Sequence, residues 1–111
     1  MVARGQIWWA DFGVPLGSEP GFVRPAVVVS SDRFNRSRIR TVIVAPVSSN
    51  LRQESIAGSV RLPDDLLAKP SVVITVQAKV VDRSRLIKYV VDLPARARFQ
   101  LDEGLRLVLD L

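Results

Sequence analysis

Glu19 and Arg24 lie in a loop rich in glycine and proline, and they are the first pair of residues that could do chemistry. Segment 17–25 reads GSEPGFVRP, and a run of apolar residues follows it directly. Pro25 fixes its own φ angle and biases Arg24 toward an extended conformation. We therefore expect the guanidinium group at the start of a strand, where it could bind a phosphate. The alternative is a surface hairpin loop that happens to carry two charges.

The chain contains neither His nor Cys, and this restricts the chemistry further. His is the usual acid or base near neutral pH, and zinc sites normally use His or Cys. We therefore expect no metal site and no cofactor, and no disulfide or thiolate chemistry. Asp64 and Asp65 follow Pro63, which favours the start of a helical turn over a metal pair. Reactions limited by positioning and charge stabilisation fit best, phosphoryl transfer among them.

The composition is that of one compact domain with an anionic partner. The chain has 111 residues, a hydrophobic fraction of 48% and a net charge of +5, from 16 basic and 11 acidic residues. This excess favours nucleic acid or an acidic protein segment as the partner. No apolar stretch approaches the roughly 20 residues of a membrane span, and residues 1–6 carry no signal-peptide core. A cytoplasmic protein is the simplest expectation.

The hydrophobic pattern predicts many short strands and one terminal helix. Apolar and β-branched runs predict strands at 7–12, 26–31, 41–47, 56–62, 72–81 and 86–93. Residues 63–67 predict a single helical turn. After Pro94, apolar residues recur at helical spacing, which predicts an amphipathic helix. The fold class is therefore mainly β (α+β), a small curled sheet or barrel with a packed C-terminal helix.

Two further patterns leave alternatives open. Trp8 and Trp9 are adjacent on a predicted strand, so they point to opposite faces. One is expected in the core, and the other stacks a base or lies in a dimer interface. The basic run of Arg33, Arg36, Arg38 and Arg40 is either a solvated loop or a surface that follows phosphates.

In their order and spacing, the motifs resemble the MazF/PemK toxins of bacterial toxin–antitoxin modules over nearly the whole chain. The match rests on Arg4–Trp8 with Asp11-Phe12, Gly17-Ser18-Glu19 with Arg24-Pro25, Val27–Ser30, Phe34-Asn35, Val44–Ser49, Gln77 with Lys79 and Asp82–Leu86, and Leu101–Glu103. The resemblance implies one toxin domain over residues 1–111. It also implies an SH3-like β-barrel with short helices and a C-terminal helix, and a homodimer.

The resemblance further implies an activity. Such toxins are metal-independent, sequence-specific endoribonucleases that cleave single-stranded RNA, often mRNA, and so stop translation. A cognate antitoxin covers them with an acidic C-terminal segment.

Residue by residue, the family pattern carries over as Arg24, Ser48 and Glu19 for catalysis. For RNA binding it implies Gln77, Arg52, Ser49, Asn35 and Lys79. Ser48 stands where the family usually has Thr, so the hydroxyl remains and the stiffening methyl is lost. Val76 replaces an acid that is common in the family.

Three other functions remain open at this level. The first is a gyrase inhibitor of the CcdB type, although no Trp lies in the segment 108–111. The second is a non-catalytic SH3-like module that binds RNA or protein. The third is a degenerate toxin that binds an antitoxin and no longer cuts RNA.

Overall fold

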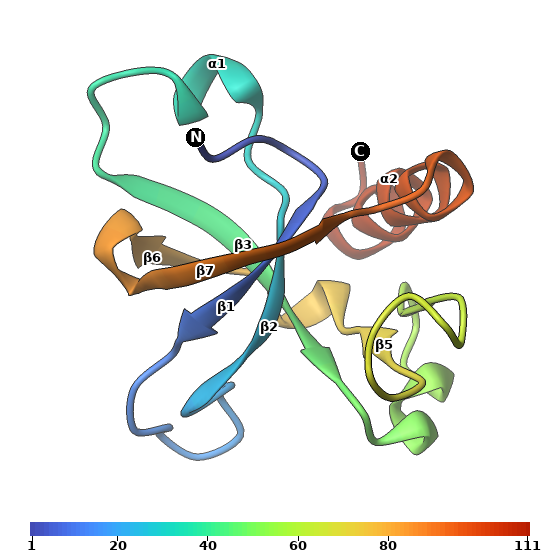
Figure 1. Cartoon of the computed structure of the whole chain (residues 1–111). Helices are drawn as coiled ribbons and strands as arrows, with labels where there is room; N and C mark the ends of the chain where they lie inside the picture. Colours follow the sequence, from blue (N-terminus) through green and yellow to red (C-terminus); the bar gives the residue numbers. More distant parts are fainter.

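Strand β3 (Thr41–Ser48) forms the centre of an antiparallel sheet in the computed structural model, which describes residues 1–111 (Figure 1). The strand order is β4-β5-β3-β2-β1-β7, and β6 also pairs with β3. The other elements are β1 (Gln6–Asp11), β2 (Val23–Val28), α1 (Asp32–Asn35), β4 (Val60–Arg61), β5 (Val72–Val73), β6 (Lys79–Asp82), β7 (Leu86–Asp92), α2 (Ala95–Leu109) and the 3-10 turns η1 (Leu51–Ser55), η2 (Thr75–Gln77) and η3 (Arg83–Arg85). The expected mainly-β fold with a C-terminal helix is confirmed.

Apolar residues are buried on both faces of the sheet. Neighbours Val27 and Val28 belong to different core clusters, because successive side chains of a strand point to opposite faces. Helix α2 covers one face with the buried Ala97 and Leu101. This double burial explains why the strand sequences read as continuous apolar runs. Neither helix is long and apolar enough to cross a membrane.

Pro46 interrupts the pairing of β3 on the side that faces β5 and β6, opposite β2. Val44 pairs with Lys79 of β6, and Val47 pairs with Val73 of β5, so residues 74–78 lie opposite only residues 45–46. Pro46 has no amide hydrogen to donate, and its carbonyl accepts the Ile74 amide at 2.9 Å. The surplus residues bulge into η2. The prediction of one strand over 72–81 was therefore wrong at its centre.

Helix α2 packs closely against the turn before β4, and the contact is made by two glycines, Gly104 and Gly58. A Cβ atom at Gly104 would overlap the carbonyl oxygen of Gly58, which also accepts the Thr75 hydroxyl at 2.7 Å. Gly58 has φ +84° and ends a turn closed by the Ser59 amide on the Ile56 carbonyl. The strand expected over 56–62 is therefore reduced to β4.

A buried polar network fixes α1 to the sheet. Asn35 is 1% exposed, donates from Nδ2 to the Ser30 carbonyl at 2.8 Å and accepts the Ser30 hydroxyl at 2.6 Å. The same hydroxyl oxygen accepts the Ile43 amide, so a side chain replaces a ladder bond and β2 ends at Val28. The Arg4 amide donates to Asp32, which lowers the pKa of that carboxyl.

We expect Gly104→Ala to destabilise the protein by about 1–3 kcal/mol, measured by urea unfolding. The same change in an open helix would stabilise it by about 1 kcal/mol. Here the new methyl must displace the Gly58 backbone. Arg106→Ala on exposed α2 surface is the control and should stay within about 0.5 kcal/mol. A gain in stability at position 104 would contradict the glycine contact.

We expect Asn35→Ala to lower the free energy of unfolding by about 2–3 kcal/mol, because Ser30 loses its buried partners. Asn50→Ala is the matched control. Its side chain is exposed and caps η1 with one bond to the Arg52 amide. That variant should lose about 1 kcal/mol. Equal losses in the two variants would argue against a buried network at α1.

Candidate functional site

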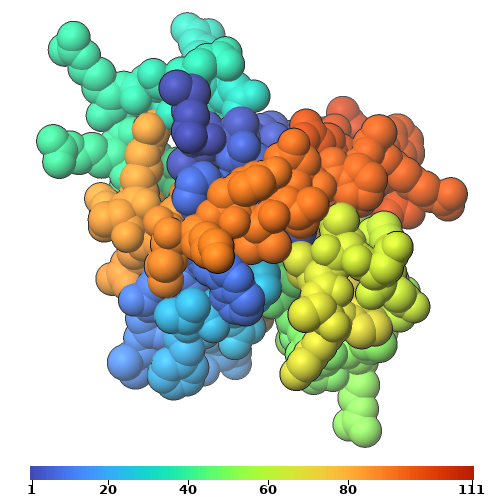
Figure 2. Space-filling view, viewed as in Figure 1, coloured from blue at the N-terminus to red at the C-terminus, as the bar shows by residue number.

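A cavity of about 580 Å³ lies between the ends of β2 and β3. The β2–β3 pairing stops at Ala26 and Pro46, while the strands continue to Val23 and Ser48. The two strand ends diverge in Figure 1. In Figure 2 the blue-to-cyan N-terminal segment, the green-to-yellow middle segment and orange β7 meet on this face, and all three contribute to the cavity wall. Arg24 and Ser48 both line it.

Arg24 presents a guanidinium group without an acidic partner. Its Nε donates to the Gly21 carbonyl at 3.2 Å, and no carboxylate forms an ion pair with it. The two terminal nitrogens make no hydrogen bond within the protein. The half-buried side chain can therefore offer both nitrogens to an anion in the cavity, and its fork suits a phosphate.

Ser48 supplies a hydroxyl on the opposite wall. If the β2–β3 register continued for two residues beyond Ala26 and Pro46, Ser48 would face Arg24. Its Oγ accepts the Asn50 amide at 3.1 Å, which leaves the hydroxyl hydrogen free to donate. Ser49 lies beside it on the cavity wall and is exposed. One cation and two hydroxyls therefore line the same cavity.

Glu19 and Gln77 lie at the neighbouring loop, outside the cavity wall. Glu19 is exposed and accepts the Leu16 amide at 3.2 Å. It makes no ion pair with Arg24, whose Nε donates to the Gly21 carbonyl. Gln77 donates from Nε2 to the Ser18 carbonyl at 3.3 Å. This bond joins loop 13–22 to η2.

The other predicted RNA contacts are dispersed. Arg52 is exposed on η1, and Lys79 is half-buried on β6 opposite Val44; neither forms an ion pair. Asn35 requires a correction. It is buried at α1, and its amide is used by Ser30 and Asp32. Because the side chain is buried and its polar atoms already have partners, we assign it to the structure of α1 and leave it out of the candidate site.

Sequence reasoning missed the fourth side of the cavity. Residues 63–67 form one hydrogen-bonded turn and no helix, and the loop that follows folds back onto the cavity. It contributes Leu66, Leu67, Lys69 and Ser71 to the wall, and Phe22 joins them from the first loop. A signal was present, because Lys69-Pro70 repeats the order of Arg24-Pro25. In both dipeptides a proline extends the backbone of a cationic residue.

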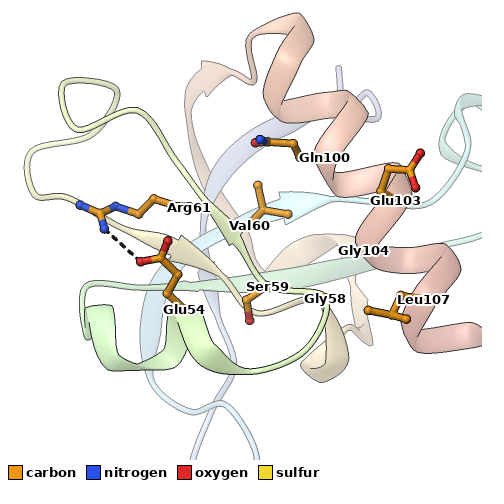
Figure 3. Close-up of a pocket in the computed structure, with 9 residues that line it drawn as sticks. All are labelled: Glu54, Gly58, Ser59, Val60, Arg61, Gln100, Glu103, Gly104 and Leu107. Carbon is orange, nitrogen blue, oxygen red and sulfur yellow. Dashed lines mark hydrogen bonds and ion pairs between the residues drawn. The ribbon is translucent and has the colours of Figure 1, made fainter.

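A second cavity of about 580 Å³ lies between α2 and the segment 54–61 (Figure 3). Arg61 there forms ion pairs with Glu54 at 3.1 Å and Asp64 at 3.0 Å. The hydrogen bond that Arg61 donates to the Asp64 carboxylate is the main cause that raises the pKa of Arg61 above its usual value. The wall contains none of the residues predicted for the site. No group of three or more acidic side chains converges anywhere in the structure.

Comparison with known proteins identifies relatives over the whole chain. Residues 3–109 match the family described as PemK-like, MazF-like toxin of type II toxin–antitoxin system. The chain is 39% identical to endoribonuclease MazF6 of Mycobacterium tuberculosis, and the match covers 100% of this chain and 99% of that protein.

Solved structures agree with this match. MazF of Deinococcus radiodurans superposes with a TM-score of 0.83 at 27% identity, covering 99% and 97% of the two chains. A MazE–MazF structure from the same organism gives a TM-score of 0.76 at 25% identity, covering 99% and 96%. The chain therefore belongs to the PemK-like, MazF-like toxin family of type II toxin–antitoxin systems.

Proposed function

We propose that this protein is a metal-independent, sequence-specific endoribonuclease that cleaves single-stranded RNA, as an mRNA interferase, and acts in the cytoplasm. The observation that carries the proposal is the unpaired Arg24 guanidinium facing a cavity that Ser48 also lines. The net charge of +5 favours a polyanionic substrate. The M. tuberculosis relative, which is named an endoribonuclease, supports the same activity.

The chemistry begins with the 2′-hydroxyl of the RNA, which attacks the adjacent phosphorus. A 2′,3′-cyclic phosphate forms, the bond to the 5′-oxygen breaks, and that oxygen takes up a proton from water. Negative charge grows on the phosphoryl oxygens, and Arg24 neutralises it with two parallel N–H bonds. Arg24 keeps its own proton in proteins and therefore acts as a charge clamp. Ser48 donates its free hydroxyl hydrogen to the same phosphate.

We assign Glu19 as the general base that accepts the proton of the 2′-hydroxyl. It projects from the loop that precedes β2 and Arg24, and its carboxylate accepts one side-chain hydrogen bond, from the Leu16 amide. The role requires RNA to draw this loop toward the cavity. Ser49 contacts the substrate in the cavity, and Gln77, Arg52 and Lys79 contact the flanking nucleotides.

We also propose that a cognate antitoxin neutralises the protein with an acidic segment and that the toxin is a homodimer. The MazE–MazF structure of D. radiodurans supports an antitoxin partner. The cationic balance of this chain complements an acidic segment, and Arg24 and Lys69, which both line the cavity, are the site at which such a segment would exclude RNA.

We expect purified protein to cut a long single-stranded RNA at discrete positions in EDTA, and Arg24→Ala to slow this by about 10²–10³-fold. Mapping the 5′ ends of the products gives the positions. Arg96→Ala removes the same charge from exposed α2 surface and should cut at the wild-type rate. Cleavage by Arg24→Ala at the wild-type rate would refute the charge-clamp mechanism.

For Ser48 we expect Ala to slow cleavage by about 10–100-fold and Thr to preserve it, because Thr keeps the hydroxyl and restricts χ1. Single-turnover rates on a short RNA that spans a mapped cut would measure this. A hydroxyl role is excluded if Ala and Thr slow the reaction equally.

A further inference from the structure

Phe22 has an unusual backbone for an aromatic residue. Its φ angle is +61°, a region that favours glycine, and only one other non-glycine residue has positive φ. Two backbone bonds hold it there. The Phe22 amide donates to the Gly13 carbonyl at 2.6 Å, and the Phe22 carbonyl accepts the Phe12 amide at 2.8 Å. The loop therefore needs this conformation, and glycine would adopt it without strain.

The Phe22 ring contributes nothing to the core that would offset this strain. The residue is 63% exposed. An exposed apolar ring on a strained backbone is doubly unfavourable for folding. Strain of this kind persists where the surroundings enforce it, and it gathers at binding sites.

Trp9 is the second exposed aromatic residue on the same cavity wall. It is 42% exposed and lines the cavity together with Phe22 and Arg24. Its neighbour Trp8 faces the other way. Trp8 packs edge-on against Tyr89, with 6.1 Å between ring centroids, and donates to Gln6. The two tryptophans therefore have different roles: Trp8 packs within the structure, and Trp9 faces the site.

We infer that Trp9 and Phe22 form a stacking platform for two unpaired nucleobases next to the phosphate held by Arg24, an inference that rests on the proposed function. The wall combines two aromatic rings with the cations of Arg24 and Lys69. Single-stranded nucleic acid is bound by this combination, since bases stack on rings while cations hold the backbone. An apolar peptide side chain would use the rings and leave both cations without partners.

The first test separates the ring from the backbone. Phe22→Gly relieves the positive φ, so its thermal midpoint should be unchanged or higher by up to about 5 °C. Its affinity for RNA should fall about 5- to 100-fold. The probe is a short RNA that spans a mapped cut, with 2′-deoxyribose at the scissile nucleotide to prevent cleavage. Phe22→Tyr keeps the ring and should bind like the wild type. A fall in the midpoint of Phe22→Gly would overturn the inference.

The second test pairs each variant with an abasic RNA. If a base stacks on Phe22, deleting the adjacent base should weaken wild-type binding about 5- to 100-fold and should barely affect Phe22→Gly. Equal losses in both proteins would show that the ring contacts no base.

A third readout needs no cleavage. In a Trp8→Phe background, 12-mers of oligo(U) and oligo(A) should quench Trp9 fluorescence. Quenching without any RNA cleavage would refute the proposed function and leave the platform standing. Cleavage that depends on Arg24, without quenching, would refute the platform alone. Quenching by an acidic peptide and by neither oligonucleotide would assign the rings to a protein partner and refute the platform.

Discussion

The missing amide hydrogen of Pro46 shapes the molecule around the central strand. Central strands rarely contain proline, because it removes one bond of the ladder. Here the chain opposite Pro46 bulges for residues 74–78 and resumes pairing on either side. β3 consequently has two partners on this edge, β6 before the proline and β5 after it. The turn η2 between them belongs to neither strand.

Two distant parts of the protein are attached to that turn. Thr75 donates its hydroxyl to Gly58, the glycine on which α2 rests. Gln77 donates to the Ser18 carbonyl in the loop that carries Glu19 and leads into β2 with Arg24. Thus the seat of the helix and the loop beside the cavity are fixed by residues two positions apart. The hydrogen bond that Pro46 cannot donate therefore creates the turn that positions both parts.

Local pattern was enough to predict most of the fold. The strands β1, β3 and β7 and the helix α2 follow from apolar runs and helical periodicity within one segment. The errors lie where a residue distant in the sequence determines the local backbone conformation. Gly58 turns the chain inside an apolar run because α2 must approach it, and η2 breaks a β-branched run because Pro46 lies opposite.

The candidate site shows the same division. Arg24 and Ser48 could be expected to converge from a family pattern, and both residues line the cavity. That Asn35 is buried, or that Lys69 returns to the cavity, depends on contacts between segments far apart in sequence. No local rule contains that information. Phe22 is an intermediate case, because the glycine-rich turn was visible and the sign of its φ angle was not.

The cavity wall includes Trp9 near one end of the chain and Val90 near the other. Strand β1 pairs with β7, so the first strand stays without its outer neighbour until the last strand is available. Contacts so distant in sequence form late, and during synthesis they wait for the C-terminal segment to leave the ribosome. The cavity wall is therefore complete only after β7 has paired with β1.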